Sequence, residues 1–197
     1  MTKQTITNNN TVETKPLTII HVLGWELDND QEQELWPNLG FLCFDISSNI
    51  EIEPKQVVLE LAADVTTAIR KGHNVALVGH SIGGYYATYV AEKYQLPTVL
   101  INPLVKAHDS LLLADVLEDS PDLEIVKIQL QELETETTEP DRIMVMLQKG
   151  DKLQDYQQVR DYYQDCNQII LNGGSHQFDH LADWVQAMTD FFNRHYQ

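Results

Sequence analysis

The stretch "ALVGHSIGGYYATYVAEKY", Ala76 to Tyr94, joins an apolar run to a segment with helical spacing through a corner of glycines around one serine. Gly79, Ser81 and Gly83 form a G-x-S-x-G pattern. In this pattern the chain leaves a strand, turns sharply and enters a helix, and the small flanking residues let strand and helix approach closely. The stretch therefore predicts a strand–turn–helix unit that presents the Ser81 side chain above the edge of a sheet.

Short apolar runs occur on both sides of this unit. They are nearly continuous rather than alternating, which is typical of strands buried on both faces of a parallel sheet. The six runs are Leu17–Leu23, Phe41–Ile46, Val75–Gly79, Thr98–Asn102, Arg142–Leu147 and Gln168–Leu171. Helical patterns separate them, so the sequence predicts an α/β fold with about six mainly parallel strands and helices on both faces.

Two of the helical patterns have clear boundaries. Pro54 suits a first helical turn, an apolar stripe runs from Val57 to Ile69, and Gly72 is a stop signal. Near the other end, apolar residues recur at spacings of three and four between Leu181 and Phe192. We expect both helices to pack on the sheet.

The chain between Asn102 and Asp141 gives a weaker signal. A short helix beginning at Asp109 or Ser110 is expected, whereas residues 123–141 fit an extended arm or a loop, and their structure stays open. Many acidic residues lie between Asp115 and Asp141, and we interpret them as a solvated face without a ligand. This segment is the only candidate for a cap over a pocket.

A length of 197 residues fits one domain, expected at residues 17–197, after a disordered N-terminal tail at residues 1–16. The tail lacks the apolar core of a signal peptide, and no run approaches the roughly 20 apolar residues that cross a bilayer. We therefore expect a soluble, cytoplasmic protein. Its oligomeric state cannot be predicted.

The formal net charge of −17, with only 13 lysines and arginines, excludes a typical nucleic-acid surface and disfavours anionic membranes. The two cysteines, Cys43 and Cys166, lie far apart without C-x-x-C spacing, so we expect buried thiols and neither a disulfide framework nor a zinc site.

The chemistry that the corner suggests needs two more groups, because a serine hydroxyl is a poor nucleophile without a base and without stabilisation of the oxyanion. In folds of this kind an acid and a histidine follow the serine in that order, each in a loop after a later strand. Asp151 follows the run Arg142–Leu147, and His176 lies in a glycine-rich loop after Gln168–Leu171. Ser81, Asp151 and His176 are therefore the candidate catalytic residues.

Each of the two later positions has an alternative. Asp155 competes as the acid, although it also suits a helix cap, and Asp109 is a more distant candidate. His180 competes as the base, but we expect it inside the final helix. His80, within the corner, is expected to point away from Ser81. The segment "HQFDH" has the spacing of a zinc helix but lacks its glutamate, so no metal is predicted.

Two segments, "GHSIGGYYATYVAEKYQLPTVLINPLV" and "LQKGDKLQDYQQVRDYYQDCNQIILNGGSHQFDHLADW", resemble the YqiA-like small bacterial esterases of the α/β-hydrolase superfamily. The resemblance covers residues 75–105 and 146–197. It implies a compact α/β-hydrolase fold with a minimal cap, hydrolysis of esters with short acyl chains, and the same roles for Ser81, Asp151 and His176. Residues 106–143 match poorly, so the substrate pockets cannot be transferred.

One departure concerns the oxyanion hole. These esterases usually open with a strand that ends H-G-F, whereas the matching place here is Leu23, Gly24 and Trp25. Because the donors are backbone groups, we expect the N–H groups of Trp25 and Ile82 to form the hole without the histidine that usually orders it.

The leading hypothesis is a serine hydrolase that cleaves small acyl esters or thioesters through an acyl-enzyme intermediate, without a cofactor. An acyltransferase or a peptidase could use the same groups. The altered Leu23–Trp25 loop and the acidic stretch motivate a different class, a non-catalytic hydrolase-like binding protein.

Overall fold

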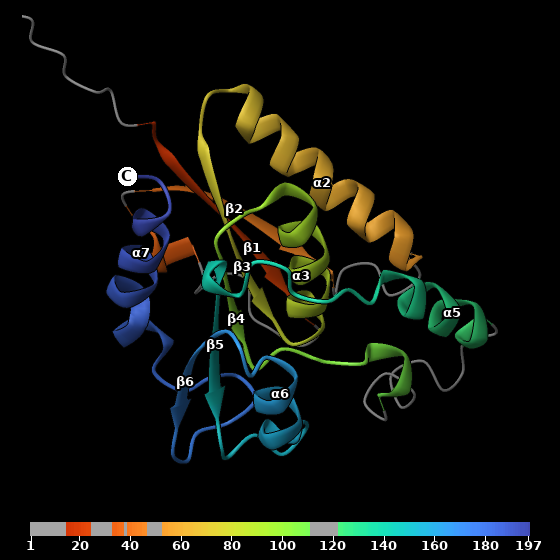
Figure 1. Cartoon of the computed structure of the whole chain (residues 1–197). Coiled ribbons are helices and arrows are strands. Elements are labelled where there is room, and N and C mark those ends of the chain that lie inside the picture. The colour runs from red at the N-terminus through yellow and green to blue at the C-terminus, as the bar shows by residue number, and fades with distance from the viewer. Residues whose placement is uncertain (1–14, 25–32, 38, 47–52, 111–121) are drawn as a thin grey trace, which may run out of the picture.

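Six strands form one sheet in which every neighbouring pair is parallel (Figure 1). The computed structural model describes residues 15–24, 33–37, 39–46, 53–110 and 122–197. The strands are β1 (Leu17–Leu23), β2 (Gly40–Asp45), β3 (Asn74–His80), β4 (Thr98–Ile101), β5 (Ile143–Gln148) and β6 (Asn167–Leu171). The prediction of a six-stranded α/β fold is confirmed, and each strand end lies within one residue of its predicted place.

The strand order β2-β1-β3-β4-β5-β6 creates a switch point between β1 and β3. The chain moves to one side of the sheet after β1 and to the other side after β3, and ligands of open α/β sheets bind at the carboxyl ends of strands beside such a point. His80 pairs with Ile101, Ile101 with Met146, and Met146 with Ile169. This register brings the ends of β3, β4, β5 and β6 to the same edge.

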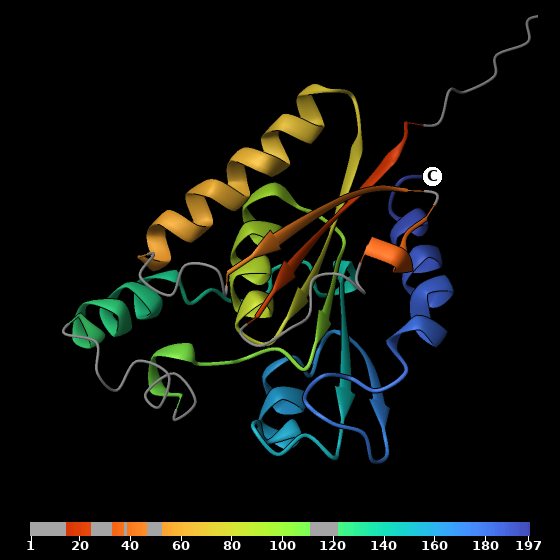
Figure 2. The same ribbon diagram turned by 180° about the vertical axis from the view of Figure 1, so that it is seen from behind.

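Helices cover both faces of the sheet (Figures 1 and 2). One face shares a hydrophobic core with α2 (Pro54–Arg70), α3 (Ile82–Tyr94), α5 (Leu123–Leu133) and α6 (Tyr156–Tyr162). The other face packs against α7 (Val185–Arg194) and the 3-10 helix η1 (Gln33–Leu35). In this second core the ring centroids of Trp36 and Phe192 lie 6.4 Å apart. Among the described residues, further 3-10 helices are η3 (Ala107–Asp109), η4 (Pro140–Arg142) and η5 (Leu181–Trp184).

The two helices with clear boundaries form where the sequence predicts them. Pro54 is the first residue of α2, and Gly72 follows its end with a φ of 84°, a conformation that favours glycine. The apolar stripe near Leu181 is divided between η5 and α7, and Met188, Phe191 and Phe192 of α7 are buried. Both helices pack on the sheet as expected.

The segment that the sequence leaves open as an arm or a loop contains the helix α5. Leu130 and Leu133 face the core, whereas Ile125 and Ile128 are exposed, so this helix has apolar residues on both sides. Mixed apolar and β-branched residues weaken the helical period, and contacts from elsewhere in the fold settle the structure. The Tyr85 hydroxyl of α3 donates to the Leu130 carbonyl.

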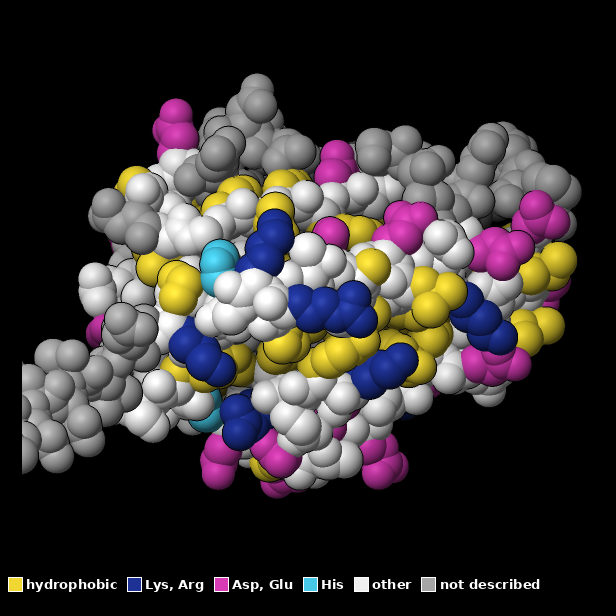
Figure 3. All heavy atoms as spheres, turned by 90° about the horizontal axis from the view of Figure 1, so that it is seen from above, with side chains coloured by type: hydrophobic (Ala, Val, Ile, Leu, Met, Phe, Trp, Pro, Cys, Tyr) yellow, Lys and Arg dark blue, Asp and Glu magenta, His cyan; other side chains and the backbone are white. Residues whose placement is uncertain are grey.

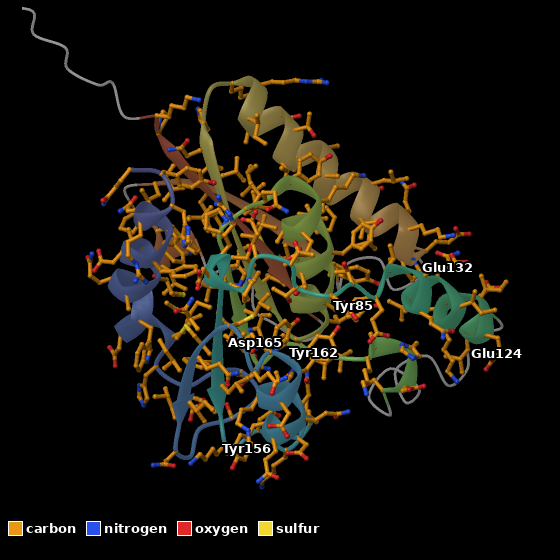
Figure 4. All side chains as sticks on the ribbon, viewed as in Figure 1. Tyr85, Glu124, Glu132, Tyr156, Tyr162 and Asp165 are labelled. Atoms are coloured by element: carbon orange, nitrogen blue, oxygen red, sulfur yellow. The ribbon has the colours of Figure 1, made fainter. Side chains whose placement is uncertain are left out.

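Figure 4 shows Glu124 and Glu132 at opposite ends of α5, and both side chains are exposed, in agreement with a solvated acidic face. The short helix expected from Asp109 or Ser110 lies mostly outside the described residues, as do residues 1–14 of the expected tail. Both cysteines are partly exposed, so the expectation of buried thiols is wrong. Partial burial nevertheless raises the pKa of the Cys166 thiol to about 11.

Basic side chains gather at the edge where the strands begin. Arg70, Lys93 and Arg194 lie in the last turns of α2, α3 and α7, where the partial negative charge of a helix end favours cations. Figure 3, viewed from above, shows lysine and arginine side chains over an apolar band on this face. None of the helices described here is long and apolar enough to span a membrane.

Candidate active site

Ser81 lies between the last residue of β3 and the first residue of α3, at the edge where the strands end. Its backbone has a φ of 55° and a ψ of −127°, a combination that costs energy for a residue with a side chain. The Ser81 N–H donates to Ile101, and its carbonyl accepts from Gly84 and Leu104. These bonds hold the strained turn, and the corner has the strand–turn–helix form that its sequence predicts.

Three glycines around Ser81 are required by close backbone packing. A Cβ atom on Gly83 would lie 2.1 Å from the Val22 carbonyl oxygen, and one on Gly79 would lie 2.7 Å from the Ala87 Cβ. A Cβ on Gly24, at the end of β1, would lie 2.8 Å from the Ser81 Cβ. Side chains at these places would push the corner away from the sheet.

His176 lies in the loop after β6, and its ring contacts both other candidate residues. The Ser81 Oγ and the His176 Nε2 are 2.9 Å apart, and the His176 Nδ1 and the Asp151 Oδ2 are 2.8 Å apart. An imidazole protonated at Nδ1 donates to the carboxylate and leaves Nε2 to accept the serine proton. All three side chains are largely buried, and that of His176 is 10% exposed.

Asp151 is held in a tight turn after β5. Its Oδ1 accepts from the N–H groups of Leu153 and Gln154 at 2.8 and 3.1 Å, and its own N–H donates to the Gln148 carbonyl at 3.1 Å. Because one carboxylate oxygen bonds the turn, the other is directed at His176. The turn thus fixes the direction of the acid.

The alternative residues occupy other places. Asp155 is the N-cap of α6, where it accepts from the Gln157 N–H at 2.9 Å. His180 is an exposed residue that precedes η5, with a φ of 63°, so it is not inside the final helix as expected. Asp109 ends η3 and lies 3.4 Å from the His108 ring nitrogen. The hydrogen bonds of the Ser81 hydroxyl and of the His176 ring nitrogens join the three leading candidates to one another.

Of the two expected oxyanion donors, only Ile82 belongs to the described residues, and Trp25 lies outside them. Ile82 begins α3, and the first N–H groups of a helix have no acceptor within the helix and carry partial positive charge. Gly24 brings the end of β1 close to this place, because a Cβ atom on it would lie 3.4 Å from the Ser81 Oγ.

Three polar residues that the sequence analysis did not assign to the site surround the His176 loop. His80 bonds the His176 carbonyl through its Nε2 at 2.7 Å, and Asn102 and Gln148 contact the same loop. Asn102 is the polar residue that ends the predicted run Thr98–Asn102, and this was a usable signal, whereas Gln148 looks like an ordinary strand residue. No group of three or more potential metal ligands is found among the residues that the structure describes.

Comparisons with known proteins agree with this architecture. A family model described as "Uncharacterised protein family (UPF0227)" matches residues 45–193. Among solved structures, Est1E from Butyrivibrio proteoclasticus is 17% identical, with a TM-score of 0.69 over 94% of this chain and 90% of that chain.

Two further structures are similar. XC6422 from Xanthomonas campestris, described as an α/β serine hydrolase without lid, is 17% identical, with a TM-score of 0.59 over 95% of this chain and 85% of that chain. The Pyrococcus furiosus esterase PF2001 is 12% identical, with a TM-score of 0.59 over 91% of this chain and 82% of that chain. The chain thus has a compact α/β-hydrolase fold.

Proposed function

We propose a function from one premise, which is that the chain belongs to the Uncharacterised protein family (UPF0227), a YqiA-like family of α/β-hydrolase fold. The proposed function is that of an esterase-type serine hydrolase. Its substrates are small acyl esters or thioesters. Ser81 is the nucleophile, His176 the base and Asp151 the acid. The observation that carries the proposal is the imidazole of His176, which bonds Ser81 through one nitrogen and Asp151 through the other.

In the first step the Ser81 oxygen attacks the carbonyl carbon of the ester while its proton moves to the His176 Nε2. The resulting imidazolium is stabilised by the Asp151 carboxylate, which keeps the ring in the productive tautomer. The same proton then passes to the leaving alcohol or thiol as the bond to the carbonyl carbon breaks. An acyl group remains on Ser81.

The second step repeats this chemistry with water as the nucleophile. His176 takes a proton from water, the hydroxide oxygen attacks the acyl carbon, and the proton returns to the Ser81 oxygen as the carboxylic acid leaves. In both steps negative charge develops on the carbonyl oxygen. The Ile82 N–H, at the positive end of α3, is the first donor to this oxygen, and the Trp25 N–H is the second.

The choice of an ester substrate is supported by the chemistry of the site and by the names of similar proteins. A Ser–His–Asp arrangement by itself does not fix the leaving group. Two of the similar proteins described above are named as an esterase and a serine hydrolase, and they support small acyl substrates in general. The preferred acyl length and the preference for esters or thioesters are therefore measured directly with the substrate series described below.

The test is labelling of the folded protein with a fluorophosphonate, with the adduct located by mass spectrometry. We expect one adduct on Ser81 and none in the matched variant Ser81→Ala. The absence of an adduct on Ser81 in folded wild-type protein would contradict the proposal and favour a non-catalytic binding protein.

A second measurement defines the substrate class. Hydrolysis of p-nitrophenyl esters of increasing acyl length is compared with hydrolysis of acyl thioesters of the same lengths. We expect turnover of the short acyl chains that disappears in Ser81→Ala. Rates close to the uncatalysed background throughout both series would argue against an ordinary esterase or thioesterase.

A further inference from the structure

Gln148, the last residue of β5, contacts the chain on both sides of His176. Its side chain is buried, with the residue only 4% exposed. The Oε1 atom accepts from the N–H groups of Ser175 and Asp179 at 3.0 and 2.9 Å, and Nε2 donates to the Asp179 carbonyl at 2.9 Å. One side chain thus fixes the residue before His176 and a residue three positions after it.

The main chain of Gln148 contacts the acid as well. Its carbonyl accepts from the Asp151 N–H at 3.1 Å, so the same residue anchors the turn that directs the carboxylate. Gln148 is therefore bonded to the loop of the base through its side chain and to the turn of the acid through its backbone.

Asn102 and His80 complete this set of contacts. Asn102, 2% exposed and directly after β4, donates from Nδ2 to the carbonyls of Ser175 and His176 at 3.0 Å, and its Oδ1 accepts from the Gln148 N–H at 3.0 Å. His80 donates from Nε2 to the same His176 carbonyl at 2.7 Å. The backbone of His176 is thus held by two buried side chains.

The loops of the acid and the base also touch directly. The Gly150 N–H donates to the Gly173 carbonyl at 2.8 Å, and a Cβ atom on Gly150 would lie 2.2 Å from the Gly174 carbonyl oxygen. Gly174 has a φ of 78°, and a Cβ on it would lie 2.0 Å from the Gln148 Oε1. The absence of a side chain at Gly150 lets the two loops touch, and its absence at Gly174 lets Gln148 reach the loop backbone.

We infer that Gln148 and Asn102 are positioning residues that set the pose of the His176 imidazole relative to both Ser81 and Asp151. A loop has no sheet partners to order it, and buried backbone groups need hydrogen bonds, so these two amides replace a strand ladder at the place where orientation matters most. This inference rests on the proposed function, because it concerns the base of that mechanism.

The first experiment compares Gln148→Leu with the matched control Gln129→Leu. Gln129 is also a nearly buried glutamine, but its hydrogen bonds join α5 to Lys55 and Glu53 at the start of α2 rather than to the His176 loop. We expect Gln148→Leu to slow fluorophosphonate labelling of Ser81 by about 10²-fold, since a displacement of about 1 Å in a catalytic group has this effect. The control should label at nearly the wild-type rate.

The second experiment asks whether Gln148 acts through His176. The same substitution is made in a His176→Ala protein, and the four labelling rates form a double-mutant cycle. A positioning role predicts that Gln148→Leu then changes the rate by less than about threefold. An equal factor in both backgrounds, or a wild-type rate for Gln148→Leu with His176 present, would overturn the inference.

If Gln148→Leu shows no cooperative unfolding transition, Asn102→Asp replaces it in the same cycle. Aspartate tolerates the φ of 39° at this position and keeps an acceptor for the Gln148 N–H, but it loses the donor to the His176 carbonyl. We expect slowing of about 10-fold or more with His176 present, within the range seen when an orienting hydrogen bond is lost, and almost none without it. The same factor in both backgrounds would refute the positioning role.

A measurement that does not need Ser81 separates this inference from the proposed function. Diethyl pyrocarbonate acylates accessible imidazoles, and modification of His176 can be followed by mass spectrometry. We expect faster modification in Gln148→Leu than in wild type or Gln129→Leu, because the largely buried ring is released. If this occurs while wild-type Ser81 is not labelled, the positioning role stands and the proposed function fails. If Ser81 is labelled, and Gln148→Leu changes neither the labelling rate of Ser81 nor the modification rate of His176, the proposed function stands and the positioning role fails.

Discussion

The Ser81 Oγ and the His176 Nε2 lie 2.9 Å apart, but the molecule holds the two residues in different ways. Ser81 is fixed by backbone packing, because glycines on three sides let a strand, a helix and the end of β1 meet around it. His176 is fixed by hydrogen bonds from buried polar side chains to an irregular loop. We call these the packed half and the hydrogen-bonded half of the site. Close steric packing holds the packed half in place, and hydrogen bonds to buried backbone groups hold the hydrogen-bonded half.

The largest effect is expected in the hydrogen-bonded half, for Asp151→Asn. An amide can direct its NH₂ group at the His176 ring and favour the wrong tautomer, so we expect ester hydrolysis to fall by about 10⁴-fold with little change in the thermal midpoint. The matched control is Asp155→Asn, which keeps an acceptor at the N-cap of α6 and should retain wild-type activity. Equal losses in the two variants would show that the contact between Asp151 and His176 is not the one that matters.

The packed half is tested by Gly83→Ala, which should act on stability. The added Cβ would lie 2.1 Å from a backbone oxygen of β1 that cannot move aside, so we expect a loss of about 3 kcal/mol in the free energy of unfolding, measured with urea. Gly72→Ala is the control, because its Cβ would meet nothing within 4 Å and only the φ of 84° is unfavourable. That variant should lose about 1 kcal/mol. Similar losses for both would remove the steric argument.

Gly24→Ala examines the boundary between the halves. Its Cβ would lie 2.8 Å from the Ser81 Cβ and 2.9 Å from the His80 carbonyl oxygen, so the serine must shift relative to the imidazole. We expect kcat to fall by about 10²-fold, with a much smaller effect on the thermal midpoint. A normal kcat would mean that the elbow can move without loss of its contact with His176.

The smallest effect is expected for Asp155→Ala, next to the hydrogen-bonded half. Loss of the bond to the Gln157 N–H removes a helix cap and should lower the free energy of unfolding by about 1 kcal/mol. Activity per folded molecule should not change. A loss of activity beyond that explained by unfolding would assign Asp155 a role in the chemistry.

The two halves also differ in how well the sequence predicts them. The corner around Ser81 is local, since strand, glycines and helix follow one another within residues 74–94, and its form is confirmed. The six strands are predictable for the same reason, because continuous apolar runs report burial on both faces. The roles of Ser81, Asp151 and His176 stay predictions that labelling and kinetics must test.

The hydrogen-bonded half depends on contacts between residues far apart in the chain. Gln148 and Asn102 are 46 residues apart, and nothing in the pattern around either one reports that their amides meet. The expectation that His80 only points away from Ser81 misses its bond to the His176 carbonyl for the same reason. The exposed residues Ile125 and Ile128 obscure the helical pattern of α5 in the sequence, and contacts with α2 and α3 stabilise the helix.

The separation of the serine and the histidine by 95 positions has a consequence for synthesis of the protein. Translation delivers the elbow long before it delivers the imidazole, and of the two amides that orient the imidazole, the one on β5 comes in the later part of that interval. On the proposed mechanism, the alcohol of a nascent chain is therefore as inert as any other serine. Reactivity begins only when the last strand has joined the sheet and its loop has closed over Gln148.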